Sequence, residues 1–297
     1  MYLGAQSWKF QFLFCNDYLA DDLMDPALTQ SHIDRDTLLA ACNSLLSPER
    51  FTDYGPNGLQ VEGKAQIRKI VSGVTASRAL IEAAIEAKAD AIFVHHGLFW
   101  RGQSGTVTGW MKQRLALLLA HDINLLAYHL PLDAHPELGN NVQLGLKLGF
   151  LPGNLPGRTA DWPEIKHFGE QLLGCMVNMA ASGQKELENG QNLKKHLEIC
   201  LNRPVSVVNV DYKAIKNIAW CTGGAQSYFE AAIAAGADAF ITGEISEPQA
   251  HLARECGVAY FACGHHATER YGAPAVAAHL AAQFGIEHEF IEIDNPA

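Results

Sequence analysis

The sequence predicts an α/β protein made of two similar lobes that arise from an internal repeat, with mainly parallel sheets. Within each copy of the repeat a strand, an alanine-rich helix and a second strand follow one another. The composition agrees, because 48% hydrophobic and 18% charged residues describe a compact globular protein rather than a disordered chain. At 297 residues the chain is long enough for two lobes, each with its own core.

The internal repeat becomes visible when the chain is aligned with itself. Residues 82–96 match residues 230–244 at a constant offset of 148 (230 − 82). In both copies a strand precedes the helix and another follows it: 70–74 and 91–94 in the first copy, 218–222 and 239–242 in the second. Two such strands lie parallel and are joined by a right-handed crossover, so each copy predicts a parallel βαβ unit.

A second match extends the repeat to polar residues. Each copy offers an imidazole and a carboxylate four residues apart after a strand: His129 and Asp133 after 124–127, and His265 and Glu269 after 259–262. The offset between the two histidines is 136 (265 − 129). Ligands of open parallel sheets collect at the carboxyl ends of the strands, so both copies fall where a site is expected.

The regular pattern begins at Asp34, where Asp34-Arg-Asp-Thr37 supplies the chemistry of a helix start before an apolar helical face. We expect residues 1–33 to be an N-terminal extension outside the core, 34–150 to form the first lobe and 151–297 the second, with interdigitation of the lobes left open. Met24 lies shortly upstream of this helix, and we hypothesise that translation starts there. Intact mass spectrometry of the endogenous protein tests this, because finding residues 1–23 present contradicts it.

Charge, apolar patterning and cysteine usage argue against several classes of protein, without excluding a nucleic-acid partner. The net charge of −10 (22 − 32) opposes a nucleic-acid-binding surface. No apolar run approaches the ~20 residues that span a bilayer. The seven cysteines are scattered, which favours free thiols in a reducing compartment over a disulfide framework. We therefore expect a cytoplasmic protein with a small-molecule partner and without a membrane segment.

Histidine pairs and carboxylates predict a metal site. His95 and His96 follow one apolar run and His265 follows another, while Asp133 and Glu269 add carboxylates. Imidazole and carboxylate groups bind Zn, Fe, Mn and Ni alike, and the absence of a thiolate from these segments argues for a site with open positions. The donors exceed what one tetrahedral ion needs, and a carboxylate can bridge two ions about 3.5 Å apart. A single histidine pair more often belongs to a core or interface, but three such segments favour two divalent ions.

Three further residues are lesser candidates for the surroundings of the site. The repeat pairs His96 with Glu244, whose alternative role is that of a helix-capping or loop carboxylate. His129 is a candidate for a group behind the ligands that orients them or moves protons. His266 neighbours a proposed ligand and either lines the pocket or points away from it.

Two glycine-containing segments and two arginines invite a phosphate interpretation. Residues 222–227 run from a strand into a helix, which suits either an anion at the helix start or a tight turn. The segment Tyr54-Gly-Pro-Asn-Gly58 combines proline and Asn-Gly turn chemistry and indicates a fixed loop. Arg101 and Arg270 have two open roles, contact with a phosphate or structural ion pairs.

Several motifs together carry a resemblance to a known family. These are Tyr54-Gly-Pro-Asn-Gly-Leu-Gln60-Val-Glu62-Gly63, Val94-His-His-Gly97, Tyr128-His-Leu-Pro-Leu-Asp133-Ala-His135, Gly139-Asn-Asn141, Thr222-Gly-Gly224 and Gly264-His-His-Ala-Thr-Glu269-Arg270. Over residues 34–297 the chain resembles the NIF-three-like family of dinuclear-metal proteins, whose members are often called GTP cyclohydrolase 1 type 2 homologues.

The resemblance implies two α/β lobes with a pair of metal ions between them and a homohexameric ring. By motif position it also implies five metal ligands, with Glu269 as the bridge: His95, His96, Asp133, His265 and Glu269. It further suggests that the loop at 54–58 borders the site.

The predicted function is that of a metal-dependent hydrolase, with one alternative. Two ions activate water and polarise a substrate oxygen, which makes hydrolysis the natural reaction. A phosphoester and a purine-ring C–N bond are both candidate bonds, so the expected substrate is nucleotide-like or phosphoester-like. No single residue is assigned as catalytic. The alternative is a non-catalytic metal-binding oligomer that serves as a metal carrier, sensor or scaffold.

Overall fold

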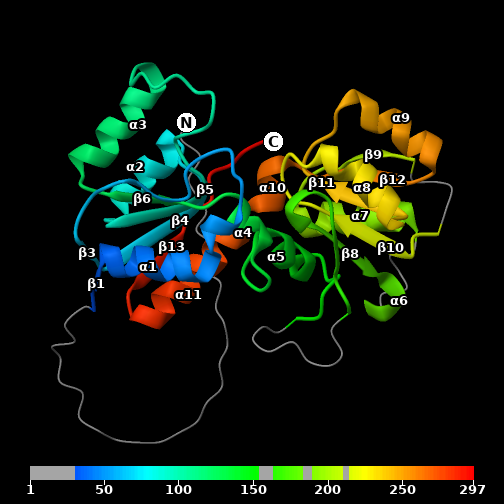
Figure 1. The fold of residues 1–297 in the computed structure, drawn as a ribbon, viewed down its shortest axis with the longest axis horizontal. Helices are drawn as coiled ribbons and strands as arrows, with labels where there is room; N and C mark the ends of the chain where they lie inside the picture. The colour runs from blue at the N-terminus through cyan, green and yellow to red at the C-terminus, as the bar shows by residue number, and fades with distance from the viewer. Residues whose placement is uncertain (1–30, 154–162, 183–188, 210–213) are drawn as a thin grey trace, which may run out of the picture.

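A computed structural model describes residues 31–153, 163–182, 189–209 and 214–297. Two separate sheets, each covered by helices, form two lobes that lie side by side (Figure 1). The first sheet has five strands in the order β13-β4-β5-β6-β2, and the second has six in the order β7-β8-β10-β11-β12-β9. A small antiparallel pair joins β1 (Ile33–Asp34) and β3 (Gln66–Ile67). The predicted α/β class is confirmed.

The first sheet is parallel except at one edge. Its strands are β4 (Lys69–Thr75), β5 (Ala91–His96), β6 (Asn124–Ala127), β13 (Glu287–Phe290) and the antiparallel β2 (Gly58–Val61). Along β5, Phe93 packs in one apolar cluster, whereas Ile92 and Val94 pack in another. The sheet is therefore buried on both faces, which is why its parallel strands are apolar runs.

Helices from distant parts of the chain cover the two faces of this sheet. The cluster that contains Phe93 includes residues of α1 (Arg35–Leu46) and α11 (Gly272–Phe284). The cluster on the other face includes residues of α2 (Arg78–Glu86) and α3 (Gly109–Ala120). One turn of 3₁₀ helix, η1 (Pro48–Arg50), follows α1.

The second sheet has a parallel centre and antiparallel flanks. The parallel strands are β10 (Asn217–Trp220), β11 (Ala239–Thr242) and β12 (Ala259–Ala262), and the flanking strands are β7 (Lys166–Phe168), β8 (Gly174–Asn178) and β9 (Ser206–Val208). Its helices are α5 (Asn140–Lys147), α7 (Gly190–Leu201), α8 (Phe229–Ala235) and α9 (Glu247–Cys256), with short turns η2 (Glu170–Leu172), α6 (Met179–Ser182) and η4 (Gln226–Tyr228).

Both predicted βαβ units are confirmed as parallel pairs. Ile70 lies opposite Ala91 in the first sheet, and the positions 148 residues further on, 218 and 239, lie opposite each other in the second. Asp90 accepts backbone N–H bonds from positions 68 and 69, and Asp238 accepts them from 216 and 217. The same strand register and the same aspartate hydrogen bonds at equivalent positions agree with a repeat of the βαβ unit. A repeat of the whole lobe stays a prediction.

The chain returns to the first sheet at its end. Helix α11 packs on β4, and β13 pairs in parallel with β4, with Glu287 opposite Lys69. The first lobe is therefore built from both ends of the described chain and the second lobe from its middle. The assignment of 34–150 and 151–297 to two domains stays a prediction about folding units.

Some boundary predictions are refined by the structure. Strand β5 continues through His96, so the histidine pair ends the strand instead of following it. Helix α1 starts at Arg35 with Asp34 as its N-cap, as the sequence predicts. The extension up to residue 30, with Met24, lies outside the described residues. Every cysteine in the described part of the chain is a free thiol. Among the helices described here, none is long and apolar enough to cross a membrane.

Candidate metal centre

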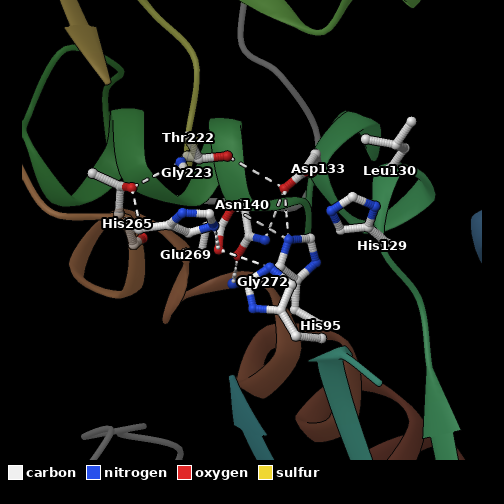
Figure 2. Close-up of polar contacts among 12 residues, drawn as sticks. His95, His129, Leu130, Asp133, Asn140, Thr222, Gly223, His265, Glu269 and Gly272 are labelled. Atoms are coloured by element: carbon white, nitrogen blue, oxygen red, sulfur yellow. Dashed lines mark hydrogen bonds and ion pairs between the residues drawn. The ribbon is translucent and has the colours of Figure 1, made fainter. Parts of the chain in front are cut away.

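The five residues expected to bind metal meet where the two lobes touch. The first lobe contributes His95 and His96 at the end of β5, and Asp133 from the short helix α4 (Leu130–Ala134). The second lobe contributes His265 and Glu269 from the short helix α10 (His265–Glu269). Figure 2 shows the side chains of His95, Asp133, His265 and Glu269 directed towards one another.

Glu269 is the centre of this cluster. Its Oε1 lies 3.4 Å from Nε2 of His95, and its Oε2 lies 3.3 Å from Nε2 of His96. Oε2 is also 3.1 Å from Nε2 of His265, one helical turn earlier on the same face of α10. On the other side, Oδ1 of Asp133 lies 3.6 Å from Nε2 of His95. One carboxylate therefore touches all three imidazoles.

A second bond fixes the orientation of each imidazole. Nδ1 of His95 donates to the carbonyl of Tyr128 at 3.1 Å, and Nδ1 of His96 lies 3.1 Å from the Thr75 hydroxyl. Nδ1 of His265 donates to Oε1 of Glu244 at 2.6 Å. Bonds of this kind set the ring orientation of metal-binding histidines and leave Nε2 to the metal. Glu244 therefore lies behind a ligand candidate, where it orients the imidazole ring.

Polar side chains hold Asp133 in the same way. Asn140 donates to Oδ1 of Asp133 at 2.9 Å, and the Thr222 hydroxyl donates to the same oxygen at 3.3 Å (Figure 2). Both residues lie within motifs of the sequence, but neither was predicted to have a role. Their only signal was a polar residue at the start of a helix for Asn140 and shortly after a strand for Thr222, which is too common to single them out.

The inner half of the cluster is buried and incompletely bonded. His95, Asp133 and Glu269 are 0%, 7% and 3% exposed. Although ion-pair distances join these residues, Nε2 of His95 and Oε2 of Glu269 have no hydrogen-bond partner of proper geometry among the described residues. Leaving such an atom without a partner costs about 1–3 kcal/mol. Two buried ligand atoms without a hydrogen-bond partner in one cluster therefore fit a site built for an ion.

Charges within the cluster shift its pKa values. Burial opposes the charged form of His95, but the carboxylates of Asp133 and Glu269 outweigh it and raise the pKa of His95 to about 9. Burial likewise opposes the charged form of His265, and its contacts with Glu269 raise that pKa to about 9. Burial lowers the pKa of His96 to about 3, which keeps its imidazole neutral. Burial favours protonation of Glu269, yet the imidazoles hold its pKa well below the usual range.

The two glycines after β10 let the backbone approach the cluster. A Cβ atom on Gly223 would run into the carboxylate of Glu269, and one on Gly224 would lie 3.3 Å from Cε1 of His265. Gly223 has a φ of +69°, and its N–H donates to the Thr268 hydroxyl at 2.9 Å. The N–H of Gly223 is therefore already bonded and does not support an anion site at the helix start. The glycine is explained instead by the close approach of the backbone to Glu269.

His129 borders the cluster and is oriented by a carboxylate that was not predicted from the sequence. Nδ1 of His129 bonds Oδ1 of Asp53 at 2.6 Å, and its ring centroid lies 4.9 Å from that of His95. Burial opposes the charge on Asp53, but bonds from His129 and Asn57 lower its pKa to about 2. The available signal for Asp53 was its position just before the turn at 54–58.

The remaining sequence candidates make bonds away from the cluster. His266 bonds the carboxylate of Glu292 at 2.6 Å through Nε2, so the interpretation in which its side chain points away holds. Arg270 donates to the Leu201 carbonyl at 2.8 Å. Arg101 donates to the Asp53 carbonyl. These contacts favour the structural role for both arginines.

The cluster opens to solvent on one side. The side chains of His96 and His265 are 17% and 30% exposed, while that of His95 is fully buried. On this open side the Trp100 ring lies 5.9 Å from the His96 ring, and the exposed Tyr54 ring lies 6.1 Å from the His129 ring. The turn at 54–58 thus borders the open side, as the resemblance suggests.

Fold and site together define an α/β protein in which two lobes enclose a buried cluster of histidines and carboxylates suited to divalent metal. The chain belongs to the family described as Duf34/NIF3 (NGG1p interacting factor 3), whose sequence profile matches residues 33–296. This confirms the resemblance seen in the motifs.

This chain aligns with similar proteins over nearly their whole length. Two curated relatives named GTP cyclohydrolase 1 type 2 homolog are 49% identical to this chain. The one from Neisseria meningitidis serogroup A is aligned over 89% of this chain and 99% of its own, and the one from Pseudomonas aeruginosa over 88% and 98%. Among solved structures, the protein ybgI, of unknown function, is 42% identical with a TM-score of 0.79, over 89% of this chain and 100% of its own. A structure from Thermus thermophilus, that of TTHA1606, is 32% identical with a TM-score of 0.71 over the same shares, 89% and 100%.

Proposed function

We propose that the cluster binds two divalent metal ions and that the protein is a metal-dependent hydrolase of a nucleotide-like or phosphoester-like substrate. The observation that carries this proposal is that two ligand atoms of one cluster, Nε2 of His95 and Oε2 of Glu269, are buried without a hydrogen-bond partner among the described residues. Native proteins rarely leave buried polar atoms unpaired, and a bound ion would satisfy both.

Among the described residues three groups of His, Asp and Glu side chains could each hold an ion; besides His95, His96 and His129, two groups that share a ligand support two ions. One consists of His95, Asp133 and Glu269, and the other of His96, His265 and Glu269; within each group the ligand atoms lie within 4.8 Å of one another. Glu269 belongs to both groups, which is the arrangement of a bridging carboxylate. The set of imidazole nitrogens and carboxylate oxygens suits Zn, Fe, Mn and Ni.

The surroundings of the cluster support hydrolysis of a substrate with a planar ring. Ions held there supply Lewis acidity and lower the pKa of bound water. Asn140 and Thr222 fix the carboxylate of Asp133, and the occupied Nδ1 atoms fix the imidazoles, so the donors need little reorganisation. Trp100 and the exposed Tyr54 offer aromatic faces on the open side, which suit stacking on a base. The name of the relatives, GTP cyclohydrolase 1 type 2 homolog, points to the same class of substrate.

We further propose that the protein works as a homo-oligomer, with the hexameric ring of the resemblance as the expected form. Apolar side chains exposed on and beside α3 support a contact between copies: Val107 is 52%, Trp110 is 53% and Leu119 is 63% exposed. Light scattering coupled to size-exclusion chromatography tests this, because a monomer in solution contradicts the ring.

The central experiment measures metal per chain in protein purified without added metal, with Glu269→Ala alongside. We expect about two ions per chain in the wild type and a sharp fall in the variant, because the shared ligand serves both ions. One ion or none in the wild type, unchanged in the variant, overturns the proposal.

Hydrolysis is then tested with a panel of nucleotides and phosphoesters. We expect turnover that Asp133→Ala abolishes while the oligomer persists. Two bound ions without turnover on any compound would instead support the non-catalytic metal-binding oligomer.

A further inference from the structure

The end of the described chain returns from the first lobe to the second. After β13 ends, the N–H of Ile291 donates to the Ser72 carbonyl at 3.0 Å, which continues the pairing with the first sheet. Ile291 and Ile293 pack against the apolar cluster beneath α2 and α3. In Figure 1 the red end of the chain runs from the first sheet towards α10.

Glu292, between these two isoleucines, faces the second lobe. Alternate residues of an extended segment point to opposite sides, so the apolar neighbours hold the first lobe while Glu292 reaches the other. Its Oε1 lies 2.6 Å from Nε2 of His266 and 3.9 Å from Nη1 of Arg270. These two residues directly follow His265 and Glu269, the two ligand candidates of the second lobe.

Arg203 connects the last residues with the start of α10. Its Nη1 donates to the Ala297 carbonyl at 2.8 Å, and its Nη2 donates to the Pro296 carbonyl at 2.9 Å. The same guanidinium lies against Gly264, where any Cβ atom would collide with it and where φ is +97°. Since Gly264 directly precedes α10 and Arg270 directly follows it, the helix is held on both sides.

The geometry of the candidate site depends on contacts that fix the two lobes relative to each other. Its ligand candidates come from two lobes, so the relative position of the lobes decides whether Glu269 reaches the imidazoles of the first lobe. Groups that orient metal ligands commonly change metal affinity by roughly 10- to 100-fold when they are removed. Among the described residues, the groups of His, Asp and Glu side chains that could hold a metal ion include no residue of the segment 291–297.

We propose that residues 291–297 form a positioning strap that holds α10 against the first lobe and thereby sets the metal affinity of the site. The proposal rests on the proposed function in one respect, that the cluster binds metal. The positioning residues are Glu292, through His266 and Arg270, and Arg203, through Gly264 and the last two carbonyls. The strap ligates no metal itself.

The test compares Glu292→Ala and a chain truncated after Asp294 with the wild type. The matched control is Glu289→Ala, because Glu289 pairs at 2.7 Å with Lys69 inside the first lobe. Two quantities are measured: the affinity for Zn²⁺ by competition with a chromophoric chelator, and hydrogen exchange of residues 264–270 in metal-free protein.

We expect both strap variants to bind Zn²⁺ roughly 10- to 100-fold more weakly. We also expect faster exchange at 264–270, with neither change in Glu289→Ala. Glu292→Gln keeps a polar contact to His266 and should recover part of the loss. Wild-type affinity and wild-type exchange in both strap variants overturn the strap. A wild type that binds no Zn²⁺ overturns the metal site instead, while the exchange comparison still decides whether the strap holds α10.

Discussion

At the scale of single residues, the candidate centre depends on how closely the backbone approaches the ligands. Gly223 combines a φ of +69° with the absence of any room for a side chain beside Glu269. Gly102 also has a positive φ, +84°, but a Cβ atom there would meet nothing within 4 Å. Alanine at Gly102 therefore costs stability only through the backbone conformation, whereas alanine at Gly223 also disturbs the site.

Gly223→Ala is expected to lose both metal and stability. The left-handed backbone costs about 1–2 kcal/mol for alanine at either glycine. The collision with the Glu269 carboxylate adds about 1–3 kcal/mol of overpacking at Gly223 alone. Urea unfolding and elemental analysis measure the two effects, with Gly102→Ala as the control. Equal metal content in Gly223→Ala and Gly102→Ala would contradict the contact.

The chemistry of a residue determined whether the sequence could predict its place in the site. The five ligand candidates stand out because histidines and carboxylates recur at the ends of strands. Asp53 and Thr75 gave no such signal, since single polar residues in loops and at strand ends are common. Their role appears only when His129 and His96 are seen to bond them.

At the scale of elements, β13 decides how the two lobes are connected. It adds to the edge of the first sheet beside β4, and the strap begins where it ends. Within this pair the half-buried His288 lies 2.8 Å from the Ser72 hydroxyl through Nε2. Burial lowers the pKa of His288 to about 4, so the strand docks with a neutral imidazole.

The docking of β13 is expected to weaken in acid. Below pH 6.5 the unfolded chain protonates this histidine while the folded chain does not, so the unfolded state binds more protons. The contribution of His288 is complete above pH 6.5 and is lost as the pH falls towards about 4. Urea unfolding between these pH values should show a smaller loss of stability for His288→Gln than for the wild type. The exposed His121 supplies the control, because His121→Gln should follow the wild-type curve; a His288→Gln curve parallel to it would refute the assignment.

At the scale of the whole molecule, the candidate site joins the two lobes. Three of its five ligand candidates lie in the first lobe and two in the second. A metal that binds the folded protein and not the unfolded chain stabilises the folded state by mass action. The two lobes and the site are therefore expected to behave as one thermodynamic unit when metal is present.

Removal of metal should lower the free energy of unfolding. At a free ion concentration of 100 times Kd the linkage is about 2.7 kcal/mol. Chelator should abolish this increment in the wild type, and Glu269→Ala should lack it from the start. Thermal or urea unfolding with and without Zn²⁺ measures it. An increment in Glu269→Ala as large as in the wild type would show that the metal binds elsewhere.

The α/β class, the parallel βαβ units and the residue types of the candidate centre follow from the amino-acid sequence alone. These features are local or periodic, because apolar runs form strands, alanine-rich segments form helices, and polar residues follow at the strand ends. Three other features emerge only from the folded chain: β13 returns to the first sheet, His266 turns to Glu292, and Glu269 meets three imidazoles. Those outcomes depend on how two lobes pack across long stretches of chain, and the direction of a side chain at such a contact leaves no periodic trace in the sequence.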